Sequence, residues 1–273
     1  AAPRLPPLHE LGLGGCGLGV QGALELAELL ATPSRGGATV GAHLEKLSLV
    51  ANGIRGAAGG RAVAAALPSV PKLEELYLLV NGLGAAGGRA VAAALPSVPK
   101  LEWLDLYGNG LGAAGGRALA EALPSVPKLE ELYLLVNGLG AAGGRAVAGA
   151  LPSVPKLEYL GLLDNGLGAA AGRAVAEALR RAVAAALPSV PELEQLWLGD
   201  NGLGEAGGRA VAGALASVPK LKAQAGVPGA VGQRGCLGAA AEAAVRAAWA
   251  AQRQWLDHPA KQPRPEEGLG LFG

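Results

Sequence analysis

The sequence has few aromatic and charged residues and no methionine. Of its 273 residues, 3% are aromatic and 16% are charged, and Phe272 is the only phenylalanine. The 23 basic and 22 acidic residues leave a net charge of +1, which excludes disorder driven by net charge. The glycines follow no three-residue period, which excludes collagen. No apolar run of about 18 residues is uninterrupted, which argues against a membrane span.

Three further absences bear on the source and chemistry of the chain. Residue 1 is Ala and no Met occurs, so we expect a fragment or a processed product. Cys16 and Cys236 are too few for a disulfide framework, and we expect an intracellular, cytoplasmic location. The histidines, His9, His43 and His258, lack the spacing of zinc ligands. We therefore expect no metal site, no cofactor and no enzymatic activity.

The dominant feature of the sequence is an internal repeat. Residues 73–100 recur almost unchanged as 101–128, and further copies begin at Leu8, Leu44, Leu129, Leu157 and Leu193. We predict seven repeats over 8–220, after an N-terminal extension at 1–7. Residues 221–258 are predicted to form a degenerate C-terminal capping unit with a helix, and 259–273 a flexible tail.

Each repeat has two halves with different periods. Leucines such as Leu76 and Leu78 alternate as on one face of a short strand. The second half, as in 89–95, is rich in Ala, the strongest helix former, and Pro96 ends it. A strand and a helix of this size bury their apolar faces only against neighbouring copies. The pattern therefore predicts an α/β solenoid.

The motif L-x-x-L-x-L-x-x-N-x-L-G resembles the leucine-rich repeat, in its ribonuclease-inhibitor-like class. This resemblance implies a horseshoe with parallel strands on the concave side and helices on the convex side. It also implies a structural ladder of buried asparagines, with Cys16 at the ladder position of the first unit. The asparagines are Asn52, Asn81, Asn109, Asn137, Asn165 and Asn201.

The glycines after each strand imitate a nucleotide-binding motif. Gly82, Gly84 and Gly87 match G-x-G-x-x-G between a strand and a helix. The same string recurs at Gly110 and Gly138, whereas a cofactor motif should occur once. We interpret these glycines as turn residues.

Aromatic residues gather on the predicted concave face. All four tyrosines and two of the four tryptophans fall at strand positions that alternate away from the leucines. Aromatic side chains dominate the binding energy of protein interfaces. The alternative is that they only stabilise the sheet by pairing across strands. The predicted contact residues are Tyr77, Trp103, Tyr107, Tyr133, Tyr159 and Trp197.

Acidic residues share this face, and Lys46 is the only basic residue placed there. A column of glutamates along the strand edge is expected to be partly neutralised by the lysines that precede each strand. One arginine per unit, as at Arg89, is expected at a helix start on the convex side. The acids expected on the concave face itself are Glu75, Asp105, Glu131, Asp164 and Asp200.

These features predict a protein–protein interaction module. An acidic, aromatic face suits a basic protein partner and opposes nucleic acid; we expect no membrane association, and the oligomeric state stays open. The resemblance also allows a second interpretation, the repeat region of a larger intracellular receptor or regulator. A NOD-like sensor would carry an NTPase domain elsewhere in its gene, and a GTPase-activating protein would accelerate GTP hydrolysis by a GTPase.

Overall fold

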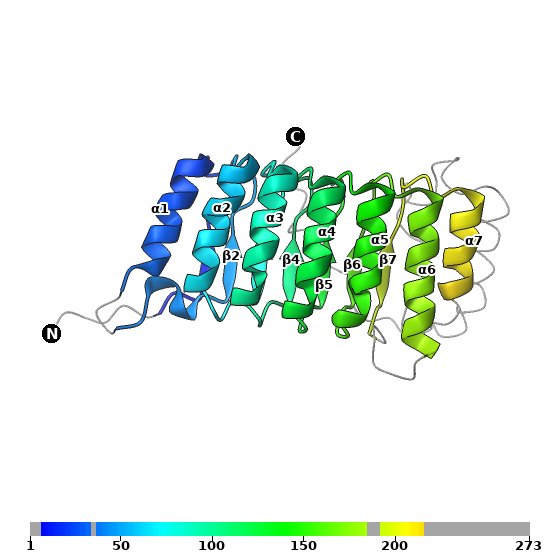
Figure 1. Cartoon of the computed structure of the whole chain (residues 1–273). Coiled ribbons are helices and arrows are strands. Elements are labelled where there is room, and N and C mark those ends of the chain that lie inside the picture. Colours follow the sequence, from blue (N-terminus) through cyan, green and yellow to red (C-terminus); the bar gives the residue numbers. More distant parts are fainter. Residues whose placement is uncertain (1–6, 34–36, 185–191, 216–273) are drawn as a thin grey trace, which may run out of the picture.

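The computed structural model describes residues 7–33, 37–184 and 192–215. Seven strands form one parallel sheet in chain order, β1 to β7. Figure 1 shows the helices side by side in a single layer, with the strands behind them. The predicted α/β solenoid, with strands on the concave side and helices on the convex side, is confirmed.

The elements alternate strictly along the chain. The strands are β1 Glu10–Gly12, β2 Lys46–Ser48, β3 Glu75–Tyr77, β4 Trp103–Asp105, β5 Glu131–Tyr133, β6 Tyr159–Gly161 and β7 Gln195–Trp197. The α-helices are α1 Gly19–Ala31, α2 Gly56–Ala66, α3 Gly84–Ala94, α4 Gly112–Ala122, α5 Gly140–Ala150, α6 Gly168–Ala184 and α7 Gly204–Leu215. Short 3-10 helices are η1 Val40–His43, η2 Leu67–Ser69, η3 Leu95–Ser97, η4 Leu123–Ser125 and η5 Leu151–Ser153.

Each strand turns one leucine into the core and two residues onto the open face. In β3, Leu76 is fully buried, whereas Glu75 and Tyr77 on either side of it are half-buried. Parallel pairing places Leu76 beside Leu104 of β4, and the same register continues along the sheet. The alternation predicted from the leucines therefore fixes which side chains face a partner.

The helices begin earlier than the sequence predicted. Helix α3 starts at Gly84, whose φ of 63° suits glycine, and runs to Ala94. Arg89 therefore lies in the middle of α3, so its predicted place at a helix start was wrong. The run Gly-Ala-Ala-Gly-Gly has weak helix propensity, but packing against the neighbouring helices favours the helical conformation. Pro96 falls in η3, directly after α3 ends.

Glycine pairs set the spacing of the helical layer. Gly60 of α2 lies so close to α3 that a Cβ placed on it would stand 2.3 Å from the Gly87 Cα. A Cβ on Gly87 would in turn meet the carbonyl oxygen of Gly56 at 2.6 Å. Gly82 precedes α3 with a φ of 68°. All three glycines of the nucleotide-like string, at 82, 84 and 87, therefore have turn or packing roles.

The predicted asparagine ladder holds adjacent units together. Asn137 is almost fully buried, and its Oδ1 accepts hydrogen bonds from the backbone N–H groups of Asn109 at 3.1 Å and Leu111 at 3.3 Å. Its Nδ2 donates to the carbonyl oxygens of Leu106 at 2.8 Å and Leu134 at 3.1 Å. Because each side chain satisfies backbone groups of the unit before it, the ladder is structural.

Two predicted segments, the capping unit at 221–258 and the tail at 259–273, lie outside the described residues. Residues 1–6 of the predicted extension also lie outside them. None of the helices within the described ranges has the length and hydrophobicity that a membrane span requires.

Candidate functional site

Five aromatic side chains form a continuous stack across the open face of the sheet. We call this set the aromatic ladder: Tyr77, Trp103, Tyr133, Tyr159 and Trp197. Successive ring centroids are 5.7, 5.0, 4.2 and 5.8 Å apart along the ladder. These distances fall within the range of stacked and tilted aromatic pairs. The ladder runs over five strands, from β3 to β7.

The ladder is diagonal in detail, because its members alternate between the two open-face positions of the strands. Tyr77 pairs in register with Asp105, so its ring meets Trp103, the other outward residue of β4. Tyr133 likewise pairs with Asp105 and stacks on Trp103. Rings on neighbouring strands thus meet across the diagonal, where long side chains remain within reach.

Carboxylates occupy the alternate positions between the rings. Glu75 and Glu131 each stand two residues before a ladder tyrosine, and both accept a hydrogen bond from that tyrosine's hydroxyl group. Asp105 stands two residues after Trp103, and its Oδ1 accepts the backbone N–H of Tyr107 at 2.9 Å. Over β3 to β5, aromatic rings and carboxylates therefore alternate on the open face.

Three of the predicted contact residues lie apart from the ladder. Tyr107 follows β4 by two residues, is 37% exposed, and makes no ring contact among the described residues. Asp164 and Asp200 follow β6 and β7 by three residues, in turns where φ is 53° and 52°. These aspartates are at the rim where the strands end, and not among the rings.

The ladder is packed and only partly exposed. Tyr159 is 8% exposed, more buried than the other ladder rings, because Gly161 leaves room beside it. A Cβ on Gly161 would lie 2.5 Å from Leu135 and 3.0 Å from the Tyr159 ring. The small residue thus allows the neighbouring side chains to close over this strand. The unpaired indole N–H of Trp103 is also buried, with no acceptor among the described residues.

Burial changes the pKa values of the carboxylates between the rings. Desolvation raises the pKa of Asp105 to about 6, although the hydrogen bond from the Tyr107 backbone N–H lowers it. Burial also raises the pKa of Glu131, and the nearby carboxylates of Glu158, Glu130 and Glu75 raise it further, while the Tyr133 hydroxyl lowers it. Concentrated negative charge in this setting is unfavourable unless a cation approaches.

The single basic residue on the open face, among the residues that the structure describes, already neutralises one acid. Lys46 Nζ lies 2.9 Å from Glu75 Oε2 and 5.2 Å from the centroid of the Tyr77 ring. Both distances meet the usual limits for an ion pair and a cation–π contact. The sequence placed Lys46 on this face but gave no sign that it would pair with Glu75 in preference to other acids.

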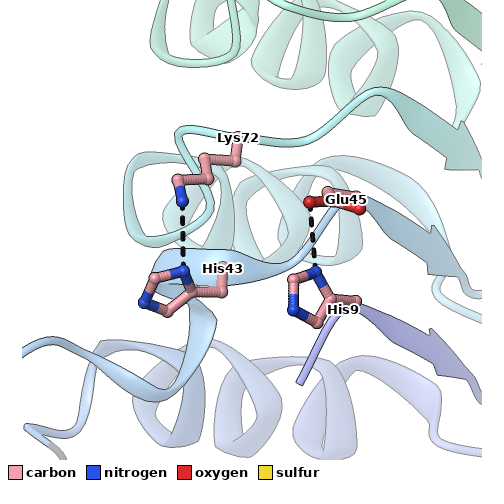
Figure 2. A network of polar contacts seen from close by, with 4 residues as sticks. All are labelled: His9, His43, Glu45 and Lys72. Carbon is pink, nitrogen blue, oxygen red and sulfur yellow. Dashed lines mark hydrogen bonds and ion pairs between the residues drawn. The ribbon is translucent and has the colours of Figure 1, made fainter. Parts of the chain in front are cut away.

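A separate polar row follows the edge where the strands begin. Figure 2 shows His9 beside Glu45 and His43 beside Lys72, with a distance of 3.1 Å in each pair. Further along this edge, burial raises the pKa of Glu130 and the flanking glutamates add to the effect, whereas Lys128 and Lys156 oppose it. For Glu130, then, the lysines do offset part of the repulsion along the column.

The comparisons with known proteins match one stretch of the repeat region. A family model described as Leucine Rich repeat matches residues 99–120, which include β4 and most of α4. No curated protein matches the chain. Among the described residues, no group of three or more His, Cys, Asp or Glu side chains is placed to hold a metal ion.

Proposed function

We propose that this chain, in which a leucine-rich-repeat model matches residues 99–120 and seven parallel strands alternate with helices, binds a basic protein partner on the concave face of its sheet. Leucine-rich repeats generally mediate protein–protein interaction. The observation that carries the proposal is the aromatic ladder, which extends over five strands with carboxylates between its rings. Four of the five ladder rings are partly exposed on the open face, where an apolar surface is more informative than the usual burial of large side chains in the core.

The dimensions of the ladder favour a macromolecule over a small ligand. Strands in a sheet are about 4.8 Å apart, so five strands extend over roughly 19 Å. Protein interfaces of standard size cover about 800 Å² on each partner, so the ladder would form the centre of an interface that extends beyond it. Aromatic residues are enriched in the buried centre of such interfaces.

The charge of the face favours a basic protein. Glu75, Asp105 and Glu131 lie between the rings, and only Glu75 has an ion-pair partner among the described residues of this face. Phosphate groups of a nucleic acid would be repelled by these carboxylates. Lysine and arginine side chains would be attracted to them. We further propose that the repeats belong to the ribonuclease-inhibitor-like class, because each unit carries a full helix.

The test is capture of the partner, followed by titration with single variants. The immobilised full chain is incubated with an extract of the source organism, bound proteins are identified by mass spectrometry, and the main one is purified. We expect Tyr107→Ala and Tyr133→Ala each to raise the Kd at least about tenfold, since buried aromatic anchors contribute most to interface energy. Tyr107 is the cleaner site, because its ring lies outside the packed ladder.

Arg89 on the exposed side of α3 provides the matched control. Arg89→Ala should leave the Kd unchanged, and the melting temperature of Tyr107→Ala should equal that of the unaltered chain. A partner that binds both tyrosine variants with unaltered affinity would place the interaction away from the concave face.

A further inference from the structure

We propose that Glu131 of β5 is the contact point for a lysine side chain of the protein partner, just as Glu75 of β3 is the contact point for Lys46 of β2. The inference rests on the proposed function and makes it more specific, because it names the residue and the group that it receives. It is carried by a comparison within the molecule, between two copies of the same Glu–Tyr pair.

The first copy is already occupied by a lysine of this chain. In the pair Glu75–Tyr77, the tyrosine hydroxyl donates a hydrogen bond to Glu75 Oε2 at 2.8 Å. The Lys46 ammonium group reaches the same oxygen at 2.9 Å and lies 5.2 Å from the centre of the ring. Lys46 comes from β2, where it pairs in register with Glu75. The pair is thus able to bind an alkylammonium ion.

The second copy has the same sequence and the same internal hydrogen bond. Residues 129–138 repeat residues 73–82 without a change, and the Tyr133 hydroxyl donates to Glu131 Oε2. The neighbour differs, however, because Trp103 occupies the register position opposite Glu131. Trp103 stacks on Tyr133 at 5.0 Å and so provides a ring contact, but it brings no positive charge.

Glu131 consequently has an ordered but uncompensated carboxylate. Among the described residues, no lysine, arginine or histidine lies within ion-pair distance of it. Its flanking residues in register are Trp103 and Tyr159, so the carboxylate is bordered by aromatic side chains on both neighbouring strands. Asp105 adds a second carboxylate on β4, one diagonal step away.

A lysine offers the chemistry that this position lacks. Its ammonium group can donate to the Glu131 carboxylate, and its methylene chain can lie along the adjacent rings. A charge-assisted hydrogen bond in a partly desolvated site is stronger than the same bond in water. The half-buried carboxylate, already held by Tyr133, loses little freedom when the cation binds.

The experiment uses the full chain and a fluorescein-labelled decalysine peptide as the probe, followed by fluorescence anisotropy. We expect Glu131→Gln to weaken binding about tenfold, as for loss of a charge-assisted contact. Glu102→Gln removes the same charge from the strand edge and should weaken binding less than about twofold. Lys46→Ala vacates the first pair and should tighten binding at least about threefold, whereas Arg89→Ala on the convex side should leave it unchanged.

Equal losses for Glu131→Gln and Glu102→Gln would overturn the proposal, because they would show attraction to net charge alone. Unchanged affinity for Lys46→Ala, or equal binding of Nε-acetylated decalysine, would overturn it as well. Titration of the variants with the captured partner distinguishes failure of this proposal from failure of the proposed function. Binding that Tyr107→Ala weakens and Glu131→Gln does not would retain the concave interface and remove the lysine contact. Binding that neither variant weakens would contradict both.

Discussion

Replacing Asn137 by Ala is expected to lower the free energy of unfolding by about 4 kcal/mol. The Asn137 side chain accepts the ladder hydrogen bonds of two backbone N–H groups, those of Asn109 and Leu111. Alanine would leave both buried without that partner, and each such group costs about 1–3 kcal/mol. The carbonyl oxygens of Leu106 and Leu134 would keep the bonds that they accept from Asn109 and Asn165. Urea unfolding followed by circular dichroism measures the loss.

Cys16 provides the control for this prediction, because it occupies the ladder position of the first unit and is exposed. Its Sγ makes only a long contact of 3.7 Å with the carbonyl oxygen of Gly14. Cys16→Ala should therefore change the free energy of unfolding by less than about 0.5 kcal/mol. If the two variants lost similar amounts of unfolding free energy, burial of a side chain in the asparagine ladder would not determine the stability of a unit.

Replacing Gly60 by Ala should destabilise the protein by about 3 kcal/mol, through steric overlap. The added methyl group would stand 2.3 Å from the Cα and 2.4 Å from the carbonyl oxygen of Gly87. These are backbone atoms of α3, so no change of side-chain rotamer relieves the overlap. Relief requires α2 and α3 to move apart, which would also disturb the leucines beneath them.

Gly149 in α5 tests whether the effect of Gly60→Ala is steric. No atom lies within 4 Å of a Cβ placed on Gly149. Gly149→Ala should therefore stabilise the protein by about 0.5–1 kcal/mol, because alanine favours the helix and restricts the unfolded chain. Melting temperatures should shift in opposite directions in the two variants. A stabilising effect of Gly60→Ala would show that the helices are not in close contact at this point.

The repeat made the sheet predictable in some detail. The alternation of leucines with polar and aromatic residues has only one arrangement in which the leucines are buried. That arrangement places Glu75 and Tyr77 together on the open face, as the structure does. The asparagine ladder was equally predictable, because an amide recurring at one position of every unit can satisfy the same backbone groups each time.

The limits of the sequence appear where neighbouring units meet. Intrinsic propensity disfavours a helix through the glycine run that opens α3, whereas these glycines allow the close packing of α2 against Gly87 that accompanies the helix. The contact of Lys46 with Glu75 depends in the same way on register between two strands. The diagonal order of the aromatic ladder also depends on the size of the residues next to each ring. Gly161, for example, leaves room beside Tyr159.

Docking of a protein partner on the aromatic, acidic face of the sheet determines which residues come into contact with that partner. The most direct measurement is photo-crosslinking with benzoylphenylalanine placed at position 107, beside the ladder, and in a second variant at position 89, on the convex side. Both positions are exposed, so neither substitution should disturb packing. We predict that the partner is crosslinked from position 107 and not from position 89. Crosslinking from position 89 alone would contradict docking on the concave face and place the partner on the convex side.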